Sequence, residues 1–253
     1  MCALNKVKGM DVCMKENFKE LRKKFNIIKN MELIESMRKG NTGVGYTFET
    51  LIGKTEDTNS LPDYNGIEIK TKLGYSKSPL TLFNCTPKRN NESAINYVLD
   101  NYSWLQKNSN NIYVFSNEVY FSKKPNKYTY FKLDIDYFNK KIFMKSYKND
   151  VFIENVCYWD FKDLMKKLYF KINYLAIIQA YPYKKNNKIY YKYVKMNSYK
   201  LKGFFEFLEA IRKNEIKVLF YMKRYSNNSI DNHGVSFSIN IENINNLFYK
   251  LKY

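Results

Sequence analysis

The sequence contains a single histidine, His233, among its 253 residues, and this scarcity removes several kinds of catalytic site. Nucleases built on several histidines and zinc hydrolases with histidine ligands cannot be assembled from one imidazole. A serine or cysteine hydrolase would have to recruit His233, and the sequence shows no nucleophile elbow. The scarcity of histidine therefore favours chemistry that needs none.

Cysteine is also scarce, and no two of the four cysteines are spaced as C-x-x-C, so neither a zinc site nor a redox motif is indicated. Free thiols in a reduced cytosolic protein are the simplest expectation. The first residues, MCALNKVKGMDV, lack the apolar core of a signal peptide. No apolar run approaches the ~18–20 residues of a membrane span. We therefore expect a cytoplasmic protein.

Basic residues, in contrast, are abundant. The chain has 43 Lys and Arg against 24 Asp and Glu, which gives a formal net charge of +19. A large positive charge favours a polyanionic partner, and nucleic acid is the first candidate. The alternative is compositional drift, because AT-rich coding sequence inflates lysine, asparagine, isoleucine and tyrosine without selection for binding. A basic membrane-surface helix is disfavoured, since no basic amphipathic helix with a bare apolar face is visible.

Apolar periodicity predicts a mixture of helices and strands, and therefore an α/β fold in which helices flank a mixed central sheet. Helices are expected at residues 15–29, 31–38, 43–53, 93–106, 159–170 and 203–213, with a final one that carries Ile244, Leu247, Phe248 and Leu251. Strands are expected at 61–72 (a hairpin), 78–83, 112–121, 128–135, 141–147, 151–157, 173–181, 188–196, 216–223 and 235–241, with a polar loop at 224–232. A change of character near residues 197–203 places a lobe boundary there, which divides the chain into 1–198 and 199–253.

The stretch LPDYNGIEIKTK, residues 61–72, organises the candidate site. Asn65-Gly66 is a strong two-residue hairpin signal, because both turn residues must reach positive φ. Such a turn pairs Tyr64 with Ile67 and places Asp63 opposite Glu68, whose Cβ atoms would then lie roughly 4.5–5.5 Å apart.

Side chains alternate along a strand, so Lys70 should share the face of Glu68, while Ile67 and Ile69 point to the core. Two close carboxylates repel each other. A divalent cation between Asp63 and Glu68 would resolve the conflict, and oxygen ligands suit Mg²⁺. We therefore expect a metal-dependent phosphodiester-cleaving site with the Ile69 carbonyl as a further ligand. The alternative is an ordinary solvated strand face, where acidic-x-basic triplets are common.

A glycine-rich stretch at residues 38–45 precedes the helix at 43–53, with Thr42 as its expected N-cap and Gly53 just past its end. It lacks the lysine and serine of a P-loop, so it is interpreted as a tight connection that touches a DNA phosphate together with Arg38. Glu49 flanks the buried stripe of this helix. It would orient Lys70 or complete a second metal site, or else be a solvated helix charge.

Five stretches together resemble one known family. They are RKGNTGVGYTFETLIG (38–53), PDYNGIEIKTK (62–72), LTLF (80–83), GFFEFLEAI (203–211) and DNHGVSFSI (231–239), in the same order as in the family. The chain resembles the MvaI/BcnI family of type II restriction endonucleases, and it is more distantly similar to the mismatch-repair nickases of the MutH kind.

The resemblance implies a restriction-endonuclease-like, PD-(D/E)xK fold that clamps DNA between two lobes. It implies Mg²⁺-dependent hydrolysis of duplex DNA, with Asp63, Glu68 and Lys70 as catalytic residues and Glu49 in support. Asp63, Glu68 and the Ile69 carbonyl would hold the metal. It further implies a monomer that nicks the two strands in turn at a short pseudopalindrome of the CC-N-GG kind, alongside a DNA methyltransferase that protects host DNA.

Six basic residues are candidate DNA contacts: His233, Arg224, Lys72, Lys88, Arg89 and Arg38. By resemblance, His233 approaches the central base pair, although Asn232-His233-Gly234 is followed by Val235-Ser236 where the family more often has Thr-Ala. Its alternative is a loop histidine with a local hydrogen bond, and Arg224 is equally a base or phosphate contact or a solvated charge. A repair nickase and a DNA-binding protein without turnover remain the rival functions.

Overall fold

A computed structural model describes residues 2–54, 61–107, 111–125 and 127–252. The chain forms two compact units, and each unit is assembled from separate segments of the sequence. Unit 1 comprises Met1–Ser78, Leu168–Lys202 and Phe248–Tyr253, and unit 2 comprises Pro79–Lys167 and Gly203–Leu247. The expected lobes, 1–198 and 199–253, are continuous, whereas these units are interleaved along the chain. The separate recognition role of the C-terminal lobe stays a prediction.

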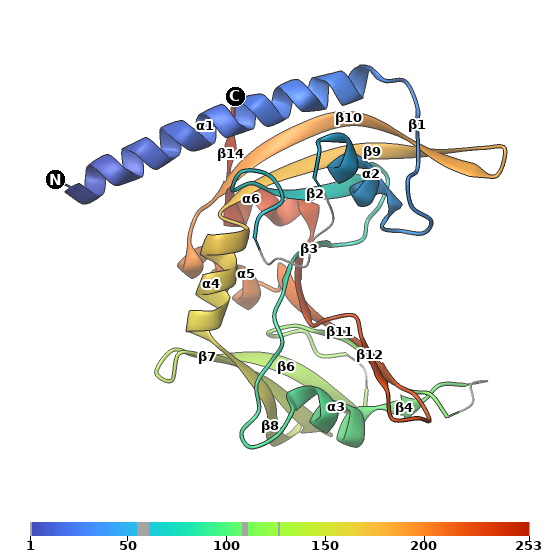
Figure 1. Ribbon diagram of the computed structural model, residues 1–253. Coiled ribbons are helices and arrows are strands. Elements are labelled where there is room, and N and C mark those ends of the chain that lie inside the picture. The colour runs from blue at the N-terminus through green and yellow to red at the C-terminus, as the bar shows by residue number, and fades with distance from the viewer. Residues whose placement is uncertain (1, 55–60, 108–110, 126, 253) are drawn as a thin grey trace. The chain divides into compact units, whose positions relative to one another are not determined.

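Unit 1 is built on one mixed sheet with strand order β1-β10-β9-β2, and β14 pairs with β10. Its strands are β1 (Ile34–Glu35), β2 (Glu68–Leu73), β9 (Tyr174–Lys185), β10 (Lys188–Leu201) and β14 (Phe248–Leu251), and its helices are α1 (Cys2–Asn30) and α2 (Gly43–Leu51). The sheet is antiparallel except at β2, which runs parallel to β9 with Glu68 beside Leu175. Helix α1 lies along β10, and α2 lies against β2 (Figure 1).

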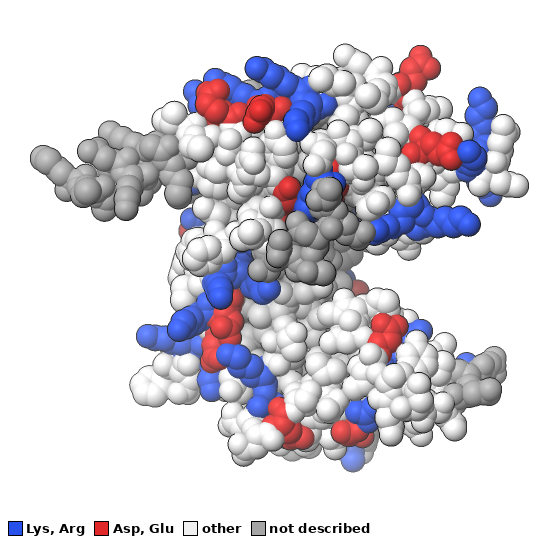
Figure 2. All heavy atoms as spheres, in the orientation of Figure 1, with Lys and Arg blue, Asp and Glu red and all other residues white. Residues whose placement is uncertain are grey.

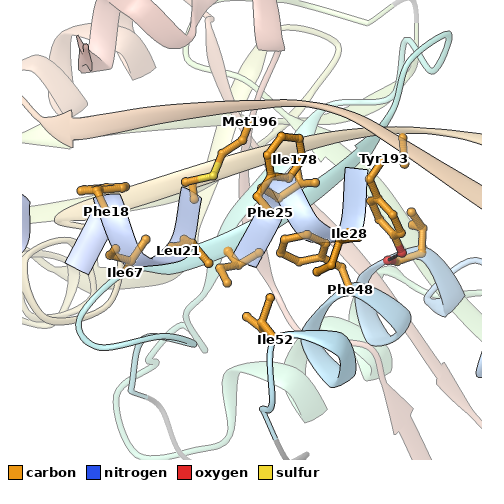
Figure 3. Packing of buried hydrophobic residues seen from close by; sticks show 14 of the residues in the cluster. Phe18, Leu21, Phe25, Ile28, Phe48, Ile52, Ile67, Ile178, Tyr193 and Met196 are labelled. Atoms are coloured by element: carbon orange, nitrogen blue, oxygen red, sulfur yellow. Dashed lines mark hydrogen bonds between the residues drawn. The ribbon is translucent and has the colours of Figure 1, made fainter. Parts of the chain in front are cut away.

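The core of unit 1 is a single hydrophobic cluster to which α1, α2 and the sheet all contribute. The apolar positions of α1 recur with the helical period and are buried: Phe18, Leu21, Phe25 and Ile28. They meet Phe48 of α2, Ile52 directly after it, Ile67 beside β2, and Ile178 and Tyr193 of the sheet (Figure 3). The Tyr193 hydroxyl donates a hydrogen bond of 2.8 Å to the Val44 carbonyl, which ties β10 to the start of α2. The start of α2 is thereby fixed against the sheet.

Unit 2 contains two sheets, one with order β3-β13-β11-β5-β4 and β12 beside β11, and one with order β6-β7-β8. Its strands are β3 (Leu80–Asn84), β4 (Trp104–Leu105), β5 (Tyr113–Val119), β6 (Thr129–Asp136), β7 (Lys141–Lys148), β8 (Val151–Asp160), β11 (Ile216–Arg224), β12 (Ile230–Asn232) and β13 (Ser236–Ile239). Its helices are α3 (Ala94–Tyr102), α5 (Phe204–Arg212), α6 (Ile244–Leu247) and the 3₁₀ turn η1 (Ile241–Asn243). Helix α4 (Phe161–Lys171) begins in unit 2 and ends in unit 1.

Aromatic side chains fill the core of unit 2. Trp159 is buried and lies edge-on to Phe237, with ring centroids 5.4 Å apart, and Phe237 stacks on Phe83 at 5.2 Å. The Trp159 indole N–H donates to the Cys85 carbonyl at 2.8 Å, so the polar end of the ring is satisfied.

Helix α1 begins at Cys2 rather than at residue 15, and the type of secondary structure differs from the sequence-based prediction in four further places. Residues 31–38 are not helical, because Ile34 and Glu35 form β1 at the edge of β10. The expected helix over 93–106 ends at Tyr102, and residues 104–105 form β4. Part of the expected loop 224–232 is β12. The final helix stops at Leu247, since the next four residues pair with β10 as β14. In each case strand pairing replaces a local preference: β1 and β14 pair with the distant β10, whereas β4 and β12 pair with the nearby strands β5 and β11.

Two smaller expectations are confirmed. Thr42 is the N-cap residue of α2, although its side chain makes no capping hydrogen bond. Gly53 follows the helix at φ +88°, as a C-terminal glycine should.

Cys13, Cys85 and Cys157 are free thiols. Among the described residues, no helix is long and apolar enough to cross a membrane.

Candidate active site

The hairpin expected at Asn65-Gly66 is present. Asn65 and Gly66 adopt φ values of 42° and 84°, as a two-residue turn of this kind requires. Tyr64 and Ile67 exchange backbone hydrogen bonds of 2.9 and 2.7 Å across it. The turn delivers the chain into β2, where Ile67 and Ile69 are buried in the core of unit 1, as expected. Glu68 and Lys70 therefore lie on the other face of this segment.

Glu68 is a buried carboxylate held by lysine. Its side chain is 1% exposed, and its Oε1 accepts a hydrogen bond of 2.7 Å from Lys70 Nζ. Lys171 Nζ lies 3.7 Å from the same oxygen. The other oxygen, Oε2, is buried and has no hydrogen-bond partner within the described part of the chain. Burial raises the pKa of the Glu68 carboxyl above its ordinary value of 4.5, while the Lys70 charge acts to lower it.

Asp63 is fixed beside Glu68 by contacts on both of its carboxylate oxygens. Oδ2 accepts a hydrogen bond of 2.9 Å from the backbone N–H of Ile69, and Oδ1 pairs with Lys54 Nζ. The Asp63 side chain is 11% exposed. Asp63 is therefore held against the start of β2, and its charge is one of the influences that raise the pKa of Glu68.

Glu49 joins this cluster from α2. Burial raises the pKa of its carboxyl, and the charge of Asp63 raises it further, while Lys54 and Lys70 oppose the shift. Helix α2 can approach β2 closely because it has no side chain at Gly45. A Cβ there would lie 3.2 Å from Thr71 Oγ1 and 3.7 Å from Glu49 Oε1. Glu49 is thus half-buried among charged neighbours rather than a freely solvated helix charge.

The carboxylates of Asp63 and Glu68 fit a magnesium ion that takes only some of its ligands from the protein. Across the described ranges, no three Asp, Glu, His or Cys side chains lie close enough to hold a metal by themselves. Mg²⁺ is commonly held by one or two carboxylates together with waters and substrate phosphate, and the site supplies two, Asp63 and Glu68. Glu68 Oε2, which is buried and accepts no hydrogen bond from the residues that the structure describes, is the atom that such an ion would satisfy. The role of the Ile69 carbonyl stays a prediction.

Two of the candidate DNA contacts belong to unit 1. Lys72 Nζ donates to the Ser78 carbonyl and lies 3.3 Å from the Ser78 hydroxyl, and burial lowers its pKa. The Arg38 guanidinium lies over the Tyr46 ring, 3.9 Å from its centroid. The loop that carries Arg38 is tight, because a Cβ on Gly43 would lie 2.5 Å from the Arg38 carbonyl oxygen. The tight connection expected from the glycines is therefore present.

The other four candidates belong to unit 2, and each has a protein partner. Lys88 pairs with Asp160 at 2.8 Å and Asp163 at 2.5 Å, and both carboxylates raise its pKa. Arg89 pairs with Glu92 at 2.8 Å and Glu154 at 3.2 Å.

Arg224 pairs with Asp100 across the fold of unit 2. His233 is 58% exposed, lies 3.3 Å from Asp231 Oδ2, and packs on Tyr221 with ring centroids 5.0 Å apart. Lys and Arg side chains, with acidic ones among them, lie over both units on the face shown in Figure 2. The roles of all six residues in DNA binding stay predictions.

Two lysines that contact Asp63 or Glu68 are not among the site residues expected from the sequence. Lys54 follows Gly53 at the end of α2, and Lys171 ends α4. Nothing in the local pattern distinguishes either from other lysines in a lysine-rich chain. Lys171 could be found only from the parallel pairing of β9 with β2, which periodicity does not reveal.

Comparisons with known proteins identify the family and the fold of the chain. The model of the MvaI/BcnI restriction endonuclease family matches residues 22–248. A solved complex of the restriction endonuclease MvaI with its cognate DNA substrate is 30% identical, with a TM-score of 0.84, over 93% of this chain and 98% of that chain. MvaI in the absence of DNA is 29% identical, with a TM-score of 0.58, over 93% and 97%. A search among curated proteins found no match. The mixed α/β fold is thus of the PD-(D/E)xK type.

Proposed function

The chain belongs to the MvaI/BcnI restriction endonuclease family and is a site-specific deoxyribonuclease, and from this premise we propose how it acts. It binds double-stranded DNA and hydrolyses phosphodiester bonds with Mg²⁺ at a short pseudopalindrome of the CC-N-GG kind. It works as a monomer that nicks one strand and then the other. A DNA methyltransferase of the same restriction-modification system protects the host in the prokaryotic cytoplasm.

The buried Glu68 carboxylate carries the proposal. An ionised group that is 1% exposed is destabilising for a fold unless it is paired, and here one oxygen has lysine partners while the other has no hydrogen bond within the described residues. Perturbed carboxylates of this kind concentrate at functional sites. A cation bound at Glu68 Oε2 would give this second oxygen a charged partner as well.

The residues divide the chemistry among them as follows. Asp63 and Glu68 would hold Mg²⁺, with the Ile69 carbonyl as a further ligand. When bound, the metal stabilises negative charge on the scissile phosphate and lowers the pKa of a water molecule. Lys70, which is 25% exposed and hydrogen-bonded to Glu68, turns to the attacking water and offsets phosphate charge. Glu49 orients Lys70 from the side of α2.

The remaining basic residues position the DNA. We propose Lys72, Lys88, Arg89 and Arg38 as contacts to the sugar-phosphate backbone, which fix register without reading sequence. His233 and Arg224 are proposed to reach base edges. Of these, His233 is the more exposed, and its 58% exposed ring is accessible to a ligand.

The test is cleavage of supercoiled plasmid by the purified protein with and without Mg²⁺, with Asp63→Asn, Glu68→Ala and Lys70→Ala alongside. Double-strand cutting by wild type alone, lost in all three variants and in EDTA, is the expected result. Variants that cut as well as wild type would overturn the site. Nicks that need a partner protein would indicate a repair nickase. Binding without any cutting would indicate a DNA-binding protein without turnover.

A further inference from the structure

A second lysine contacts the buried Glu68 carboxylate from a distant part of the chain. Lys171 Nζ lies 3.7 Å from Glu68 Oε1, the oxygen that already accepts the hydrogen bond from Lys70. That separation is an ion-pair distance and exceeds the length of a hydrogen bond. The Lys171 side chain is 24% exposed, so its ammonium is only partly desolvated.

The topology of unit 1 explains how Lys171 reaches this position. Lys171 is the last residue of α4, and β9 begins three residues later at Tyr174. Strand β9 runs parallel to β2, with Leu175 beside Glu68. Parallel strands begin at the same edge of a sheet, so the segment that leads into β9 passes the start of β2. The proximity of Lys171 to Glu68 is thus fixed by the backbone as well as by the side chain.

Two lysines at one carboxylate oxygen exceed what a structural ion pair needs. Lys70 alone neutralises Glu68, and burying a further cation beside it is not stabilising by itself. In the mechanism proposed above, however, Lys70 turns toward the attacking water. Glu68, 1% exposed, would then lose its hydrogen-bonded cation, and an uncompensated buried charge is strongly destabilising.

We propose that Lys171 is a positioning residue that holds Glu68 Oε1 throughout the reaction, so that Oε2 stays directed at the metal while Lys70 serves the nucleophile. This inference rests on the proposed function of the same site. It assigns the two lysines different tasks, because Lys70 acts on the water and Lys171 acts only through Glu68.

The test compares Lys171→Met, Lys171→Gln and Lys171→Arg with Lys166→Met, a matched loss of charge at an exposed position of the same helix. Under single-turnover conditions at saturating enzyme, Lys171→Met and Lys171→Gln should slow cleavage by about 10- to 100-fold, as the loss of a residue that orients a metal ligand does. Lys171→Arg should retain a rate within about threefold of wild type, since it keeps the charge. Lys166→Met should cleave like wild type.

A second readout needs no cleavage. Binding of Mn²⁺ to the DNA-free enzyme, measured from the signal of free Mn²⁺ in electron paramagnetic resonance, should weaken by about tenfold in Lys171→Met and Lys171→Gln. Affinity for DNA in EDTA should match that of Lys166→Met. Using two neutral variants keeps the test decisive if one of them fails to fold.

Either of two results would overturn the inference. The first is that Lys171→Met and Lys171→Gln cleave DNA and bind Mn²⁺ like wild type. The second is that Lys171→Arg cleaves DNA as slowly as Lys171→Met. If wild type itself cuts no DNA, the proposed function fails instead. The Mn²⁺ measurement then still decides whether Lys171 supports the carboxylate.

Discussion

Replacing Glu68 by glutamine should abolish cleavage and at the same time stabilise the fold. The wild-type carboxylate is 1% exposed, and its Oε2 has no hydrogen bond within the described part of the chain. Glutamine keeps an acceptor for Lys70 but removes the buried charge. Lys70 and Lys171 are 25% and 24% exposed, so water can solvate them when their ion partner is lost.

The expected gain is about 1 kcal/mol in the free energy of unfolding, within the range of ~0.5–2 kcal/mol that single stabilising substitutions commonly give. For a protein of this size that corresponds to an increase of roughly 2–4 °C in the midpoint of thermal unfolding. Glu16→Gln is the control, because Glu16 pairs with Lys19 at 2.8 Å on the surface of α1, and its replacement should leave the midpoint nearly unchanged.

The gain in the free energy of unfolding of Glu68→Gln should depend on pH in a direction that the pKa of Glu68 determines. Burial raises the pKa of Glu68 above 4.5, so its ionised form destabilises the folded state at pH values above the folded pKa. This penalty disappears as pH falls through the folded pKa toward the unfolded value near 4.5. The advantage of glutamine should therefore be largest near neutral pH and shrink in acid. Thermal unfolding in EDTA at pH 7.5 and pH 5 measures it.

A decrease of more than about 1 kcal/mol in the free energy of unfolding of Glu68→Gln, a loss typical of a disrupted structural group, would refute this prediction. It would equally be refuted if the advantage of glutamine grew as pH fell. Retained cleavage by this variant would contradict the assignment of Glu68 to the metal.

Three further substitutions test the frame around the site. Gly43→Ala should destabilise unit 1 by about 1–3 kcal/mol in chemical denaturation, because its Cβ would lie 2.5 Å from the Arg38 carbonyl oxygen, and an unchanged midpoint would contradict the tight loop. Tyr193→Phe should lower stability by about 1 kcal/mol through loss of the buried hydrogen bond to Val44, and a smaller loss than at an exposed tyrosine would argue against that bond. Lys72→Met should weaken DNA binding equally for specific and random duplexes and reduce the slope of log affinity against log salt by about 1, whereas a sequence-dependent loss would make Lys72 a base reader.

Local chemistry was enough to predict the hairpin. Asn65 and Gly66 determine a turn whose two central residues need positive φ, and the alternation beyond it separates Ile67 and Ile69 from Glu68 and Lys70. The expected ordering of buried and polar positions was therefore correct in β2. The burial of Glu68 does not follow from this alternation, because burial on that face depends on elements from elsewhere in the chain.

Long-range pairing is what the sequence could not reveal. Ile34 has helix-like apolar neighbours in residues 31–38, yet it pairs with Tyr191 as an edge strand. Phe248 and Leu251 also fit a helical stripe, but they extend the sheet beside β10. Lys171 cannot be assigned to the site from the sequence for the same reason, since only the parallel register of β9 against β2 brings it to Glu68.

The most direct test of the central claim is to sequence the ends of plasmid DNA digested by the purified enzyme with Mg²⁺, for wild type and Glu68→Ala. A metal-dependent, site-specific nuclease should leave ends at one short pseudopalindromic sequence, and Glu68→Ala or EDTA should leave the plasmid intact. Ends scattered over unrelated sequences, or the same ends produced by Glu68→Ala, would contradict the account.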